Sequence, residues 1–160
     1  MNWRAKARLL FVVVVVLAAA SVATATNHVL KGTYIDTVNG TDVTIPAGTL
    51  TAIGNPVTVS CPGTTGTCII EADMWAQNAG GSTTGNDFLL CLYVDGTAVD
   101  PYCFGYAGVT PADGSVLMGS SSQSLSGVAA GSHTVQTYFW SRNGGCFVQY
   151  RHFTYRVYKP

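Results

Sequence analysis

The chain has 160 residues with eight basic and eight acidic side chains, so that its formal net charge is zero and only 10% of it is charged. It contains no basic stretch that would neutralise several phosphates, and we therefore expect no nucleic-acid partner. The length fits a single domain with one hydrophobic core.

The N-terminal segment has the pattern of a secretory signal. Basic residues precede the apolar run Leu9 to Ala20, and Ala23-Thr24-Ala25 offers the small residues after which signal peptidase cuts. The run holds about a dozen apolar residues, whereas a membrane-spanning helix needs roughly 20. We predict a cleaved signal at residues 1–25 and a mature domain at 26–160. That domain is expected in an extracellular or periplasmic space, without membrane contact after cleavage. An uncleaved anchor is the alternative.

The mature chain has the pattern of an all-β protein. No helix-length window shows apolar residues at a period of 3.6, and short β-like runs are instead separated by Gly, Pro, Asn and Asp. About eight to ten short strands without a crossover helix predict an antiparallel β-sandwich of the jelly-roll type, with a closed barrel as the second choice. The strand-like runs are 33–38, 42–45, 50–53, 57–61, 68–76, 88–94, 97–99, 102–106, 115–125, 133–142 and 146–158.

Turn signals predict how some of these strands connect. Asn39-Gly40 closes the first run and, with Thr41, forms an N-glycosylation sequon, so that a plain turn and a glycosylated Asn39 are both open. Asp95-Gly96 predicts a tight hairpin. Residues 108–114 have the composition of a connecting loop. The last two runs, joined by Asn143-Gly144-Gly145, are expected to form a hairpin.

The five cysteines all lie in the predicted mature domain, where an oxidising space permits disulfides. Cys61 and Cys68 enclose a turn-rich loop, and Cys91 and Cys103 flank the next turn; we predict both pairs. Cys146 is then unpaired, as a buried small hydrophobe or as an intermolecular bridge. A connectivity in which Cys146 replaces a member of the second pair also stays open. The spacings do not fit zinc, and we predict no metal and no cofactor; calcium held by loop aspartates is the alternative.

The run 68–76 shows the clearest alternation. One face is apolar and is expected to point into the core. The other face carries Glu71, Asp73 and Trp75, and Gln77, just after the run, continues this face. Carboxylates and an amide beside a flat indole ring suit a row of sugar hydroxyls. We therefore predict a non-enzymatic binding or surface-interaction module whose partner is a glycan or another cell-surface component. The alternative is an ordinary polar face whose Trp75 is covered by a loop.

A small glycoside hydrolase is a less favoured alternative. Glu71 and Asp73 are two residues apart on one strand face, hence roughly 7 Å apart, which is a spacing that carboxylate pairs of glycoside hydrolases also use. However, no Gly-x-Ser-x-Gly motif occurs, and no motif gives His28, His133 or His152 a catalytic partner. We therefore expect that the protein is not an enzyme.

The last run offers a second candidate surface. Its residues Phe153, Tyr155 and Val157 are expected to point inward. Exposed apolar patches often mark interfaces, and the opposite face of this run is partly aromatic. An oligomeric structural or assembly protein is therefore the second functional hypothesis. The candidate self-association residues are Tyr150, Thr154, Arg156 and Tyr158.

Gly131-Ser132-His133-Thr134-Val135 resembles the start of a late strand in many small β-sandwich modules exported by bacteria. This short segment implies the fold alone, because it points to no family with a known activity. No site residue is carried over from it.

Overall fold

The computed structural model describes residues 28–38, 42–79, 86–101, 106–110, 117–142 and 145–160. The predicted signal, Asn39 and Cys103 lie outside these residues. Eleven strands are assigned within them, and several are longer than the short strands expected. The strands are β1 (Val29–Val38), β2 (Val43–Ile45), β3 (Leu50–Ala52), β4 (Val57–Cys61), β5 (Thr67–Ala79), β6 (Asn86–Val94), β7 (Thr97–Ala98), β8 (Tyr106–Thr110), β9 (Leu117–Ala129), β10 (Gly131–Ser141) and β11 (Cys146–Lys159).

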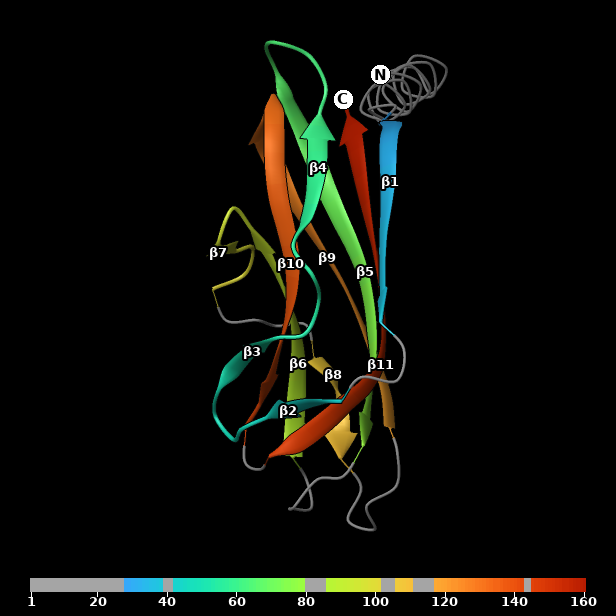
Figure 1. Ribbon diagram of the computed structural model, residues 1–160. Coiled ribbons are helices and arrows are strands. Elements are labelled where there is room, and N and C mark those ends of the chain that lie inside the picture. The colour runs from blue at the N-terminus through green and yellow to red at the C-terminus, as the bar shows by residue number, and fades with distance from the viewer. Residues whose placement is uncertain (1–27, 39–41, 80–85, 102–105, 111–116, 143–144) are drawn as a thin grey trace, which may run out of the picture.

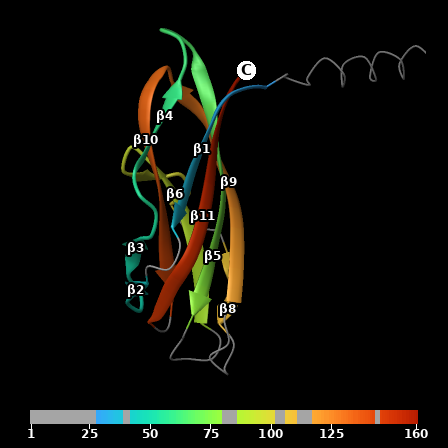
Figure 2. The same ribbon diagram turned by 45° about the vertical axis from the view of Figure 1, so that its right-hand side comes forward.

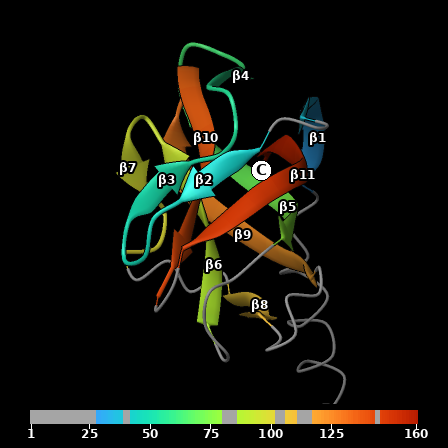
Figure 3. The same cartoon turned by 60° about the horizontal axis from the view of Figure 1, so that its bottom comes forward.

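These strands form a two-layered antiparallel β-sandwich, which confirms the predicted jelly-roll-like fold class (Figure 1). One sheet has the order β1-β11-β5-β9, with β2 paired to β11. The other sheet has the order β3-β10-β6-β7, with β4 paired to β10 and β8 paired to β6. Figure 2 shows β1, β11, β5 and β9 together in one layer. In Figure 3, β2 and β3 lie across one end of the sandwich, where β2 joins one sheet and β3 the other.

The last two strands belong to different sheets, so the predicted hairpin between them is wrong. β10 pairs with β6, β3 and β4, whereas β11 pairs with β1, β5 and β2. Their buried faces meet across the interior instead, and Thr137 Oγ1 lies 2.8 Å from the Tyr155 hydroxyl. A Gly-rich turn indicates that the chain reverses, but not whether it returns in the same sheet or in the facing one.

Residues 106–110 form strand β8, although residues 108–114 were expected to be a connecting loop. The strand pairs with β6, and within the described residues it pairs on that side only. Glycine weakens a strand and proline ends its ladder, which is why Gly108 and Pro111 predict a break. Glycine is tolerated where a strand has no second neighbour, and residues 111–114 of the expected loop lie outside the described residues. Most of the expected strand at 102–106 lies outside the described residues.

The hairpin predicted at Asp95-Gly96 is confirmed. β6 and β7 pair antiparallel around it. Asp95 and Gly96 have φ angles of 51° and 76°, which are the left-handed values that a type I′ turn requires at both central positions.

The core lies between the two sheets and is built from alternate residues of each strand. The predicted inward residues Phe153, Tyr155 and Val157 are fully buried. Phe88 of β6 stacks on Phe139 of β10, with ring centroids 5.2 Å apart. The apolar face of β5 is buried as well, so its polar face lies on the outside of the sandwich. The buried residues of β5 are Cys68, Ile70, Ala72, Met74 and Ala76.

Gln123 of β9 completes the ladder of β6 between β7 and β8. Its side-chain oxygen accepts a hydrogen bond from the Leu92 N–H at 2.8 Å, and its side-chain nitrogen donates to the Leu90 carbonyl at 3.1 Å. β8 pairs with Asn86–Leu89 and β7 with Tyr93–Val94, so these two backbone groups lie between the two ladders. The amide therefore takes the place of a neighbouring strand and ties one sheet to the other.

A buried cation, Arg151, also connects the sheets. It is 5% exposed; its Nε donates to the Ile53 carbonyl, and its Nη1 donates to the Val148 carbonyl at 3.3 Å. Burial lowers the pKa of Arg151, while the negative charge of nearby Asp36 opposes this effect. Asp36 is itself buried and accepts a hydrogen bond from the Asn55 N–H at 2.7 Å. These contacts hold β1 and β11 against the connection between β3 and β4.

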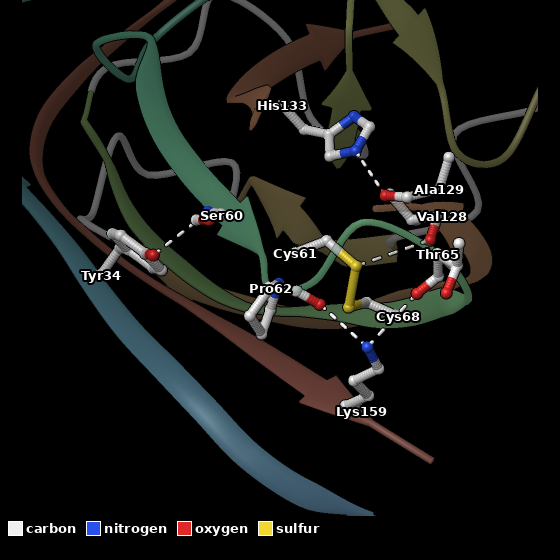
Figure 4. The surroundings of a disulfide bond; sticks show 10 residues. All are labelled: Tyr34, Ser60, Cys61, Pro62, Thr65, Cys68, Val128, Ala129, His133 and Lys159. Atoms are coloured by element: carbon white, nitrogen blue, oxygen red, sulfur yellow. Dashed lines mark hydrogen bonds between the residues drawn. A yellow bond between two sulfur atoms is a disulfide. The ribbon is translucent and has the colours of Figure 1, made fainter. Parts of the chain in front are cut away.

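The predicted disulfide between Cys61 and Cys68 is present and closes the connection from β4 to β5. Figure 4 shows the end of β11 held against this loop by Lys159. The Lys159 Nζ donates to the Pro62 carbonyl at 2.9 Å and to the Thr65 carbonyl at 3.4 Å. The disulfide and this lysine together fix one end of the sandwich.

The remaining described cysteines have different states. Cys91 is disulfide-bonded, and its predicted partner Cys103 lies outside the described residues. Cys146 has a free, buried thiol. Burial raises the pKa of Cys146 to about 11, so this thiol is almost entirely protonated near neutral pH.

Candidate functional site

The two sets of predicted surface residues lie side by side on one sheet face. β5 is flanked by β11 on one side and by β9 on the other. Directly opposed residues of antiparallel strands project from the same face, so the polar row of β5 lies between a row of β11 and a serine-rich row of β9. We call this surface the outer face. Its cross-strand triplets are Arg156–Glu71–Ser124, Thr154–Asp73–Ser122 and His152–Trp75–Ser120.

Asp73 is held by neighbours on both sides. Its Oδ1 accepts a hydrogen bond from the Ser122 hydroxyl at 2.7 Å, and its Oδ2 forms an ion pair with Arg156. The Ser122 hydrogen bond, and after it that of Arg156, keep the pKa of Asp73 below its ordinary value of 3.8. Because both carboxylate oxygens are engaged, Asp73 orients Ser122 and Arg156 on the outer face.

Glu71 is partly buried and makes no hydrogen bond with the residues that the structure describes, but Arg156, opposite it on β11, interacts with it electrostatically. It lines a shallow depression of about 230 Å³ between β5 and β9, together with Asp73, Ser122 and Ser124. A serine hydroxyl both donates and accepts hydrogen bonds, whereas a carboxylate only accepts them. The depression therefore presents a carboxylate acceptor beside serine hydroxyl groups.

Trp75 is the next outward residue along β5. Its ring lies parallel to the imidazole of His152 within 23°, with ring centroids 6.4 Å apart. The imidazole is held by two threonines, since Nδ1 lies 2.7 Å from Thr37 Oγ1 and Nε2 lies 3.1 Å from Thr154 Oγ1. β1 and β11 thus fix the imidazole beside the indole, and Trp75 stays partly exposed.

Beyond Trp75 the outer face becomes apolar. Met118 of β9 lies opposite Gln77 and is 66% exposed. Phe147 and Tyr150, near the start of β11, are 46% and 42% exposed. The outer face therefore has a polar half around Glu71 and an apolar half around Tyr150.

The residues predicted for self-association are divided between these halves. Tyr150 belongs to the apolar half, whereas Thr154 contacts His152 and Arg156 is paired with Asp73. Tyr158 is partly buried and lies opposite Ile69 of β5. His152 and the serines of β9 also belong to the site, although they were not predicted there. The alternate positions of Ser120, Ser122 and Ser124 were the available signal.

The state of Asp73 does not suit the general acid of a glycoside hydrolase. The general acid of such an enzyme has a raised pKa, whereas the pKa of Asp73 is lowered. Within the described ranges, no group of three or more His, Cys, Asp or Glu side chains is placed to hold a metal ion. The same part of the chain contains no helix long and apolar enough to cross a membrane.

No family model and no curated protein matches the chain. Among solved structures, it is similar to a chain of infectious bursal disease virus, Gx strain, with a TM-score of 0.45 and 12% identity over 78% of this chain and 32% of the viral chain. A mutant VP2 protein of the same virus, from derived T=1 particles, gives a TM-score of 0.39 and 12% identity over 80% and 36% of the two chains. The chain thus spans about a third of the length of these viral chains.

A carbohydrate binding module of Cellvibrio mixtus lichenase 5A, solved with cellotriose, is also similar, with a TM-score of 0.26 and 21% identity over 82% of this chain and 90% of the module. All three TM-scores are below 0.5. For that reason no ligand, activity or residue role is transferred to this chain.

Proposed function

We propose that this protein is a secreted, non-enzymatic binding module that binds carbohydrate on the outer face. The observation that carries the proposal is a shallow depression lined by Glu71, Ser122 and Ser124, with the partly exposed indole of Trp75 further along the same face of β5. Sugar hydroxyls both donate and accept hydrogen bonds, and Glu71, Ser122 and Ser124 offer matching groups. The apolar face of a sugar ring packs against an aromatic ring, which Trp75 supplies.

The state of Asp73 argues against a role as general acid and fits a positioning role within a binding site. Its carboxylate is committed to Ser122 and Arg156, and its lowered pKa keeps it ionised. An ionised, doubly engaged carboxylate orients its neighbours and is a poor proton donor.

A matched pair of tryptophan variants tests the proposal. Trp75→Ala should weaken retention on immobilised polysaccharides by about tenfold or more, which corresponds to roughly 1.4 kcal/mol of binding free energy. Its thermal midpoint should stay close to that of the wild type. Trp140→Ala, which removes a partly exposed tryptophan of β10 in the other sheet, should leave retention unchanged. Full retention by Trp75→Ala would remove Trp75 from the site.

Self-association is the second candidate function, and the apolar half of the outer face favours it. Met118, Phe147 and Tyr150 expose large apolar side chains at one end of the sheet, and such patches often mark interfaces. Sedimentation equilibrium of the mature protein should then show a defined oligomer that Met118→Lys dissociates. A strictly monomeric wild type at high concentration would eliminate this candidate.

A further inference from the structure

The charges of the outer face indicate the class of carbohydrate, an inference that rests on the proposed function. The polar half carries two carboxylates and one guanidinium, from Glu71, Asp73 and Arg156. Arg156 forms an ion pair with Asp73. Arg156 also lies opposite Glu71 and interacts with it electrostatically, so one guanidinium faces two carboxylates. The depression therefore has a net negative charge.

This charge favours neutral sugars over acidic ones. A hydroxyl group of a neutral sugar donates to the Glu71 carboxylate, and such charge-assisted hydrogen bonds are stronger than those between neutral groups. A uronic acid or a sulfate ester would instead place a second negative charge near Glu71. Like charges repel, and more strongly where water is partly excluded.

The spacing along β5 indicates an oligosaccharide. Trp75 lies four residues from Glu71 on the same strand face, which corresponds to roughly 13 Å at the rise of a β-strand. A monosaccharide is too small to contact both side chains. The depression and the indole are used together only by a chain of sugars that lies along β5.

We infer that the outer face binds a neutral oligosaccharide along β5, from Glu71 to Trp75, and that Glu71 discriminates against acidic glycans. The test begins with an array of neutral and acidic glycans probed with the mature protein. Calorimetry then compares the best neutral hexasaccharide with hexagalacturonate and with the monosaccharide of the neutral series.

The neutral hexasaccharide should bind at least about tenfold more tightly than hexagalacturonate, and the monosaccharide should give no measurable heat. Glu71→Gln should weaken binding of the neutral hexasaccharide by about tenfold. It should also reduce the ratio between the affinities for the neutral hexasaccharide and for hexagalacturonate. Asp42→Asn is the matched control, because it removes one negative charge from an exposed residue beside β2, far from Glu71 along the sheet. It should change neither affinity.

The outcomes separate this inference from the proposed function. Acidic glycans that bind as tightly as neutral ones, through a site that Trp75→Ala abolishes, would overturn the neutral preference and leave carbohydrate binding intact. An equally tight monosaccharide would overturn the extended binding mode. A wild-type protein that binds no glycan on the array would overturn the proposed function and this inference with it.

Discussion

The indole of Trp75 and the imidazole of His152 lie side by side on neighbouring strands, with ring centroids 6.4 Å apart. One belongs to the polar row of β5 and the other to the outward row of β11. Their contact joins two candidate surfaces that are far apart in the chain into the single outer face. Binding and self-association would therefore use adjacent halves of the same sheet.

Cys146 should resist alkylation in the folded protein. Its thiol is buried, and burial raises its pKa to about 11, so that little thiolate exists at pH 8. Mass spectrometry after iodoacetamide treatment at pH 8 should show no label on Cys146 in the native protein and full labelling in denaturant. Rapid native labelling would show that this thiol is accessible.

Two acceptors stabilise the protonated form of His133. Its Nδ1 lies 2.7 Å from Asp95 Oδ2, and its Nε2 lies 2.8 Å from the Ala129 carbonyl. Both ring nitrogens donate only in the imidazolium. The hydrogen bond to Asp95, followed by that to Ala129, raises the pKa of His133 above its ordinary value of 6.5. The same pairing lowers the pKa of Asp95 below 3.8.

The His133–Asp95 pair should make stability depend on pH. The raised pKa of His133 gives a stabilisation that is complete below the unfolded value near 6.5 and is lost as the pH rises through the folded value. The contribution of Asp95 is present above pH 3.8 and is lost as the pH falls through its lowered value. Asp95 is 53% exposed, so solvent screening limits the pair to about 0.5–1 kcal/mol.

Urea denaturation of the wild type and of His133→Gln checks this prediction. The wild type should exceed the variant in unfolding free energy by more at pH 5.5 than at pH 8.5. Comparing the two proteins cancels the titration of the other histidines. An advantage that is equal at both pH values would mean that His133 is not protonated through this pair.

Removal of the buried guanidinium should destabilise the sandwich strongly. Arg151→Met leaves the Ile53 and Val148 carbonyls without this donor and Asp36 without a nearby positive charge, for a loss of about 3 kcal/mol. The control is Arg142→Met, an exposed arginine whose contact over Trp140 is worth less than about 1 kcal/mol. Equal unfolding free energies of the two variants would contradict the structural role of Arg151.

Gln123 should contribute more to the free energy of unfolding than a partly exposed side chain usually does. Gln123→Leu leaves the Leu92 N–H and the Leu90 carbonyl without this amide, at a cost of about 1–3 kcal/mol. Ser126→Ala on the same strand removes an exposed hydroxyl and should cost less than about 0.5 kcal/mol. Thermal or urea unfolding measures both, and a neutral Gln123→Leu would show that the bridge is dispensable.

Features that depend on a short stretch of chain could be predicted from the sequence. The alternation of Cys68 to Ala76, the turn at Asp95-Gly96 and the disulfide between Cys61 and Cys68 are all present. Each follows from local geometry: a period of two, left-handed φ values, or a loop that returns on itself. The fold class follows because many such segments occur without a helical pattern.

Features that depend on pairing could not be predicted in this way. The turn after β10 does not reveal that β11 continues in the other sheet. Likewise, the neighbours of Glu71 are set by the register of β5 with β9 and β11, which distant parts of the chain decide. The alternating serines of β9 could therefore be recognised in the sequence, but their proximity to Glu71 could not.

The fluorescence of Trp75 gives the most direct test of carbohydrate binding on the outer face. Residues 26–160 contain two tryptophans, Trp75 and Trp140, so Trp140→Phe leaves Trp75 as the sole tryptophan of this segment. Titration of this variant with the best neutral oligosaccharide should change the Trp75 emission saturably, with the same Kd as calorimetry. An emission that stays constant while calorimetry records full binding would place the ligand away from the outer face and contradict the account.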